Sequence, residues 1–243
     1  MAGTLTRDDF VKEVLDNVAK TSTAQTRSST TLETMAIRYL NRAQRRIARK
    51  EDLLYCIATA NTVASQKDYA LPSNIRALFT IRLEDGLESV KLGPMMPWEF
   101  DRLVPKPDEV NTGRPDIYIP FRTTNSFELF KIPDAVYVLR LRYSFWPADF
   151  TLASQVSEYT HMDDVISGWA TMYLYYWLQE YADAGEWDKL TSVAFAEGVV
   201  AEREGFPDWE PVSRGFNSQS PLSVGEYWND PLIREDAALR SIH

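Results

Sequence analysis

Residues 35–60 read MAIRYLNRAQRRIARKEDLLYCIATA, and the spacing of the hydrophobic residues changes inside this stretch. Before Tyr55, small and apolar side chains recur every three or four residues, which is typical of an amphipathic helix. From Tyr55 onward, short alternating or β-branched runs follow, which is typical of strands. We therefore predict a long helix over residues 32–54 that leads into a β-rich module. The apolar stripe of this helix consists of Ala36, Leu40, Ala43 and Ile47.

Three further segments have the spacing of helices. Thr6 is a suitable N-cap for a helix over residues 6–19. Apolar and aromatic side chains predict another helix over 162–182, ended at Ala184-Gly185, and a last one over 187–204. The aromatic stripe of the 162–182 helix is expected to face the core rather than to bind a ligand.

The middle of the chain has the pattern of an antiparallel β module. The segments Glu84-Asp85-Gly86 and Thr124-Asn125-Ser126 have the composition and length of hairpin turns. A short helix is expected to begin at Pro97 and end near Leu103. Alternation is clearest over 135–145, which predicts one buried and one solvated face. The predicted strands are 56–63, 68–70, 77–83, 87–92, 116–122, 126–131 and 135–145.

These elements predict an α+β fold, in which a mostly helical bundle of two N-terminal and two C-terminal helices carries an inserted antiparallel β module. The expected division is 1–54 for the N-terminal helices, 55–148 for the β insertion, 149–205 for the C-terminal helices and 206–243 for an extended C-terminal arm. Prolines recur along the arm, so it cannot form a long helix. Its large aromatic side chains are expected to pack either on a partner or on the arm's own domain. They are Trp209, Phe216, Tyr227 and Trp228.

Basic residues gather on one side of the helix over 32–54. At about 100° per residue they fall opposite the apolar stripe, so they are expected to face away from the core. This pattern is typical of a solvated face, and it also suits contact with an acidic neighbouring subunit or with DNA. The residues concerned are Arg38, Arg42, Arg45, Arg46 and Arg49.

Composition limits the function classes. The chain has 26 Lys and Arg against 35 Asp and Glu, a formal net charge of -9, whereas proteins that grip nucleic acid need a dense basic surface. The single cysteine, Cys56, cannot form an internal disulfide, so the fold must be stable in a reducing compartment. The N-terminus lacks a signal-peptide pattern and no stretch approaches ~20 apolar residues, so export and membrane insertion are not expected.

Residue types that carry catalysis are scarce. The only histidines are His161 and His243, and the chain has no glycine-rich phosphate loop, no Gly-x-Ser-x-Gly elbow and no paired cysteine motif. His161 stands near Asp163 and Asp164 at the start of a predicted helix, where capping and the helix dipole explain the acids better than a metal site does. We therefore expect no enzymatic activity, no metal and no cofactor.

Short motifs occur in a fixed order over roughly residues 30–205. They are Ala36-x3-Leu40-Asn41-x-Ala43-Gln44-x2-Ile47, Asp68-Tyr69-Ala70-Leu71-Pro72-Ser73-Asn74, Gly113-Arg114-Pro115-Asp116-x-Tyr118, Phe130-x2-Pro133-Asp134-Ala135-x-Tyr137-x-Leu139-x-Leu141-x-Tyr143 and Met162-Asp163-Asp164-Val165-Ile166. With the order helix pair, β insertion, helix pair and arm, the chain resembles the head-to-tail adaptor (connector) proteins of tailed bacteriophages.

The resemblance implies a structural protein of the virion neck that assembles in the host cytoplasm. Such adaptors form a ring, typically of about twelve copies, beneath the portal protein. The ring extends the channel through which genomic DNA passes without sequence-specific binding, and it offers a platform for a tail protein, either a nozzle or a tail-completion protein. The five arginines and the four aromatic residues of the arm are our candidate oligomer or portal interface.

Two other functions compete with this interpretation. A nucleic-acid-binding protein would use the basic helix face and would lose affinity steeply as salt rises. A carbohydrate- or ligand-binding β module would use Trp98, Tyr118 and Trp146, and it requires these aromatic side chains to be exposed on one face.

Overall fold

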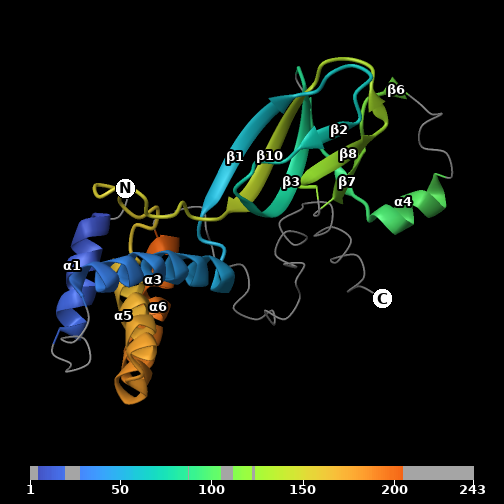
Figure 1. The fold of residues 1–243 in the computed structure, drawn as a ribbon. Helices are drawn as coiled ribbons and strands as arrows, with labels where there is room; N and C mark the ends of the chain where they lie inside the picture. The colour runs from blue at the N-terminus through green and yellow to red at the C-terminus, as the bar shows by residue number, and fades with distance from the viewer. Residues whose placement is uncertain (1–4, 20–27, 87, 105–111, 122–123, 205–243) are drawn as a thin grey trace. The chain divides into compact units, whose positions relative to one another are not determined.

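The computed structural model of this chain describes residues 5–19, 28–86, 88–104, 112–121 and 124–204 (Figure 1). The chain divides into two compact units, Met1–Val199 and Val200–His243. The expected arm over 206–243 lies outside the described residues. The four-part division expected from the sequence stays a prediction.

Helices that precede and follow the β strands in the sequence share one hydrophobic core, which confirms the expected α+β class. They are α1 (Arg7–Val18), α3 (Ser29–Lys50), α5 (Asp163–Leu178) and α6 (Tyr181–Glu204). The core includes Phe10, Leu40, Ile47 and Trp169, each completely buried. Within the described ranges, no helix is long and apolar enough to cross a membrane.

Local side-chain hydrogen bonds set the first residues of α1 and α3. Thr6 caps α1 as predicted, since its hydroxyl accepts from the backbone N–H of Asp9 while the Asp9 carboxylate accepts from the N–H of Thr6. Ser28 caps α3 by accepting from the N–H of Thr31, so this helix begins at Ser29, before the expected residue 32.

The boundary between α5 and α6 differs from the prediction. Gln179 ends α5 in the left-handed region, at φ 67, and its N–H donates to the carbonyls of Tyr175 and Tyr176. Gly185 lies inside α6, so the expected break at Ala184-Gly185 was wrong, as was a start at 187. A glycine inside a helix costs only about 1 kcal/mol, which packing of the fully buried Ala184 can offset.

The β module consists of two four-stranded sheets, with strand orders β1-β10-β3-β4 and β2-β8-β7-β5, and a two-stranded pair, β6-β9. Side chains of both larger sheets share a second core. Pairing is antiparallel except in β5–β7 and β6–β9. The strands are β1 (Tyr55–Asn61), β2 (Asp68–Ala70), β3 (Ile75–Asp85), β4 (Glu88–Lys91), β5 (Gly93–Pro94), β6 (Thr112–Gly113), β7 (Ile117–Phe121), β8 (Ser126–Phe130), β9 (Ile132–Pro133) and β10 (Val138–Phe145).

Most predicted elements of this module agree with the structure. The short helix α4 (Pro97–Leu103) has Pro97 in its first turn, and both expected turns join antiparallel neighbours. Gly86 has φ 60 and Asn125 has φ 51, which these two residue types tolerate best. The two-residue strands were not predicted, because two residues show no alternation.

One row of the first sheet brings like charges together. Arg140 of β10 lies opposite Arg82 of β3, which in turn lies opposite Lys91 of β4. Cross-strand neighbours have Cβ atoms about 5 Å apart, and like charges in such pairs destabilise a sheet. Glu84 pairs with Arg140 at 3.2 Å and offsets part of this repulsion.

We expect Arg82→Glu to stabilise the protein, since it replaces two like-charge pairs by two opposite-charge pairs. The expected gain in the free energy of unfolding is about 1 kcal/mol at low salt, measured by urea denaturation. Arg142→Glu is the matched control, because Arg142 faces Ile57 and Thr80 on its neighbouring strands. Equal changes in the free energy of unfolding of both variants would show that repulsion along the row does not affect stability.

Candidate functional site

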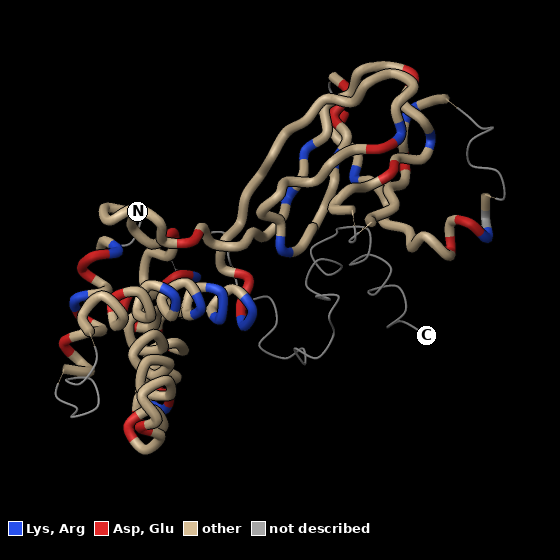
Figure 2. The backbone as a smooth tube through the Cα atoms, in the orientation of Figure 1, with Lys and Arg blue, Asp and Glu red and all other residues tan. Residues whose placement is uncertain are grey.

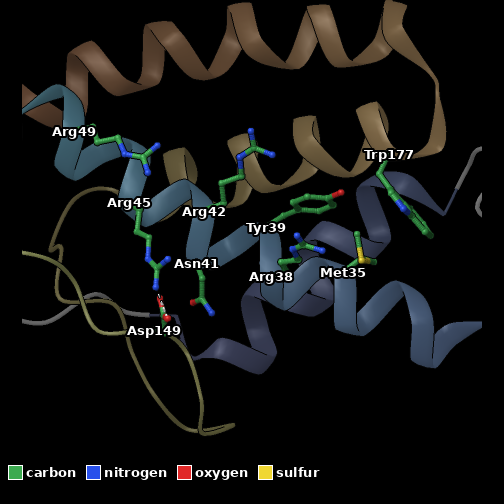
Figure 3. Close-up of a pocket in the computed structure, with 9 residues that line it drawn as sticks. All are labelled: Met35, Arg38, Tyr39, Asn41, Arg42, Arg45, Arg49, Asp149 and Trp177. Atoms are coloured by element: carbon green, nitrogen blue, oxygen red, sulfur yellow. Dashed lines mark hydrogen bonds and ion pairs between the residues drawn. The ribbon is translucent and has the colours of Figure 1, made fainter.

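A groove of about 670 Å³ runs along α3 (Figure 3). α3 supplies most of its lining, Asp149 comes from the segment between β10 and α5, and Trp177 projects from α5. Lys and Arg gather along the C-terminal half of α3 (Figure 2). The lining residues are Met35, Arg38, Tyr39, Asn41, Arg42, Arg45, Arg49, Asp149 and Trp177.

The groove carries more positive charge than its own carboxylate neutralises. Its lining contains four exposed arginines and a single carboxylate, that of Asp149, which pairs with Arg45 at 2.6 Å. The guanidinium of Arg42 lies 4.2 Å from the centre of the Tyr173 ring, a cation–π contact. Among the described residues, no carboxylate pairs with Arg38, Arg42 or Arg49.

Neighbouring contacts hold the walls of the groove in place. The side-chain oxygen of Asn41 accepts from the backbone N–H of Phe150 at 2.7 Å, which fixes the segment that carries Asp149. The Tyr39 ring packs 5.9 Å from the Tyr173 ring. Burial raises the pKa of the Tyr39 hydroxyl, while nearby Arg38 acts in the opposite direction.

Arg46 departs from the prediction that all five arginines face away from the core. Its guanidinium lies 4.3 Å from the centre of the Trp169 ring and pairs with Asp188 of α6 at 3.0 Å. It immediately precedes Ile47, which places it about 100° around the helix, on the flank of the apolar stripe. Arg46 therefore ties α3 to α5 and α6, and the other four arginines form the groove.

The aromatic face required by a carbohydrate-binding module is contradicted. The side chain of Trp98 is 68% exposed, but Tyr118 is buried in the core of the β module and Trp146 is half-buried. Since a sugar-binding platform needs its rings exposed together, these three residues do not form one.

The start of α5 partly agrees with its interpretation as a capped helix. Asp163 and Asp164 lie in the first turn, where the helix dipole favours acids, but the N-cap is Met162, without a side-chain hydrogen bond. The Oδ2 of Asp163 accepts from the backbone N–H of Leu5 at 3.4 Å. Across the part of the chain that the structure describes, no three His, Cys, Asp or Glu side chains are placed to hold a metal ion.

The resemblance to phage adaptors is confirmed by a comparison against known families. The sequence profile described as SU10 adaptor protein matches residues 6–205. This chain belongs to the SU10 adaptor protein family. The family consists of phage head-to-tail adaptors, so membership implies interaction with phage portal and tail proteins and a place in the virion neck. Structural adaptor families of this kind are generally non-enzymatic. A search of curated proteins gave no match.

Two groove residues of this SU10 adaptor were not anticipated. Asp149 lies 104 residues from its partner Arg45, and no periodic pattern indicates such a pair. Trp177 belongs to the aromatic stripe expected in the core, although it also lines the groove. The other candidate residues, Trp209, Phe216, Tyr227 and Trp228, lie outside the described residues.

Proposed function

We propose that this SU10 adaptor assembles into a ring of about twelve copies beneath the portal protein and extends the DNA channel. The ring provides the platform on which the tail docks, through a nozzle or tail-completion protein. Genomic DNA passes through its lumen without sequence-specific contacts. Virions would contain it at the neck, after assembly in the host cytoplasm.

The arginine groove is the observation that carries this proposal. Arg38, Arg42 and Arg49 are exposed cations without a carboxylate partner among the described residues, in a chain of net charge -9. Exposed charges of one sign recruit a surface of the opposite sign. In a ring built from copies of this acidic chain, acidic protein surfaces are abundant partners. The groove is therefore proposed as a contact with a neighbouring copy or with the portal.

The segment over 206–243 is proposed as a second contact. Burying Trp209, Phe216, Tyr227 and Trp228 on a partner would contribute on the order of 2 kcal/mol each, before the cost of ordering the chain. Repeated around a ring, such a contact would hold the adaptor to the portal.

Replacing Arg42, Arg45 and Arg49 together by Ala is expected to weaken ring formation on the portal at least about tenfold, because it removes three of the four groove cations. The monomer should keep its fold, since all three side chains are exposed. The measurement is the mass of the complex formed with portal protein at physiological salt, with thermal melting as the check on folding.

Replacing Lys91, Arg140 and Arg142 by Ala provides the matched control, since it removes three exposed cations from the β module instead. This control variant should dock on the portal as the wild type does. If the variant at Arg42, Arg45 and Arg49 docks as well as the control, the basic face is only solvated. If its main defect is instead the loss of salt-sensitive DNA binding, the nucleic-acid-binding alternative holds.

A further inference from the structure

Helix α6 carries an exposed stripe whose chemistry complements the groove. Leu190 and Val193 are 66% and 62% exposed, although most large apolar side chains of the bundle are buried. Glu186 and Glu197 flank them, both exposed. Among the described residues, neither glutamate has a cationic partner. We call Glu186, Leu190, Val193 and Glu197 the α6 stripe.

The α6 stripe points away from the helices of its own copy. Asp188 pairs with Arg46 of α3, and Phe195 packs 5.2 Å from the ring of Trp169 in α5. These contacts fix the buried side of α6. At about 100° per residue, Leu190 and Val193 fall on the opposite side. The stripe is therefore a surface separate from the groove.

Groove and stripe have the same spacing. Arg38, Arg42, Arg45 and Arg49 follow the steps four, three and four, and so do Glu186, Leu190, Val193 and Glu197. Alternating steps of three and four residues keep side chains on one seam, the arrangement by which two helices interlock. Both rows span about 17 Å at 1.5 Å per residue.

Charges also match position by position. Arg38 and Arg49 stand at the ends of the row, and among the described residues neither has an ion pair or a cation–π contact. The two glutamates stand at the ends of the stripe. Leu190 and Val193 would lie on the aliphatic parts of the Arg42 and Arg45 side chains, because long basic side chains can cover apolar surface. The guanidinium groups would keep their contacts with Tyr173 and Asp149. Because the stripe has a carboxylate at each end, both charge pairs can form whether α6 runs parallel or antiparallel to the α3 helix of the other copy.

We propose that the α6 stripe of one copy occupies the arginine groove of the next copy. The contact is heterologous, because two different surfaces of the same chain meet, and repetition of such a contact generates a closed ring when the rotation permits. This inference rests on the proposed adaptor ring and names the interface that builds it.

Two charge-reversed double variants test the contact. The groove variant carries Arg38→Glu and Arg49→Glu, and the stripe variant carries Glu186→Arg and Glu197→Arg. Each variant alone places like charges at both ends of the contact. We expect each to lose ring assembly on the portal at least about tenfold while keeping its melting temperature. Native mass spectrometry of the portal complex measures the assembly.

A 1:1 mixture of the two variants is the decisive sample. The reversed groove then meets the reversed stripe, and the native groove of the stripe variant meets the native stripe of the groove variant. Assembly should return to the wild-type level, with the two chains in equal number. Control pairs Lys91→Glu with Arg142→Glu, and Glu99→Arg with Asp101→Arg, change as many exposed charges elsewhere and should assemble unmixed.

If either test variant forms rings alone, the proposed contact is wrong. It is also wrong if both variants are folded but their mixture does not assemble. The second result would mean that the groove takes the portal rather than the stripe. A wild-type chain that forms no ring on the portal would instead refute the proposed function, and the contact with it.

Discussion

Trp169→Ala is expected to lower the free energy of unfolding by about 3–5 kcal/mol, which is a large part of the stability of a typical domain. Trp169 is completely buried in the helical core, and its ring packs 5.2 Å from that of Phe195. The cationic groups of Arg46 and Lys50 lie 4.3 Å and 5.1 Å from its ring centre. Truncation leaves a cavity where α3, α5 and α6 meet.

Urea denaturation of the full chain measures this loss. We expect a lower urea concentration at the midpoint of unfolding, with an unchanged dependence of the free energy of unfolding on urea concentration. Trp169→Phe should cost less than half as much, since it keeps a ring and removes a buried indole N–H that has no hydrogen-bond partner among the described residues. Trp98→Ala, at an exposed position, should change stability by less than about 0.5 kcal/mol. Similar losses at Trp98 and Trp169 would contradict the assignment of the core.

Gly168→Ala is expected to cost about 1–3 kcal/mol, although alanine is the better helix former. A Cβ atom on Gly168 would lie 2.4 Å from the Oγ1 and 3.2 Å from the Cβ of Thr191. Both residues are buried where α5 and α6 meet, so the Thr191 side chain or one of the two helices must shift. Thermal and urea unfolding of the full chain would measure the effect.

The chain offers a matched control and a rescue for this substitution. Gly185→Ala, in α6, should stabilise by up to about 1 kcal/mol, because a Cβ there meets nothing within 4 Å. Thr191→Ala removes the closest atom, so the double variant Gly168→Ala with Thr191→Ala should lose less than the sum of the single losses. Additive losses would show that the two helices do not meet at this point.

Local patterns predicted much of the fold. The N-cap at Thr6, the turns at Gly86 and Asn125 and the alternation over 135–145 depend on neighbours within a few residues. The end of α5 was missed because Gln179 adopts a conformation that its residue type rarely takes, while Gly185 tolerates the interior of α6. Sequence spacing therefore located the elements better than their boundaries.

The candidate site was predicted only in part. Helical spacing placed Arg38, Arg42, Arg45 and Arg49 on one exposed side of α3, and the structure brings them into one groove. The same reasoning failed for Arg46, which lies beside the apolar stripe of α3. Whether a residue at such a position is exposed depends on which helix packs next to it, here α6. Asp149 could not be predicted, because only folding brings it to Arg45.

By itself, the sequence determined the α+β class, the apolar stripe of α3, its basic side and an overall acidic chain, because these depend on residue spacing and composition. Only the tertiary structure decided that Arg46 packs on Trp169, that Tyr118 is buried and that Leu190 and Val193 remain exposed on α6. The physical reason is that periodicity fixes the direction of a side chain relative to its own helix or strand. Burial and charge pairing depend on the elements packed beside it, which come from distant parts of the chain.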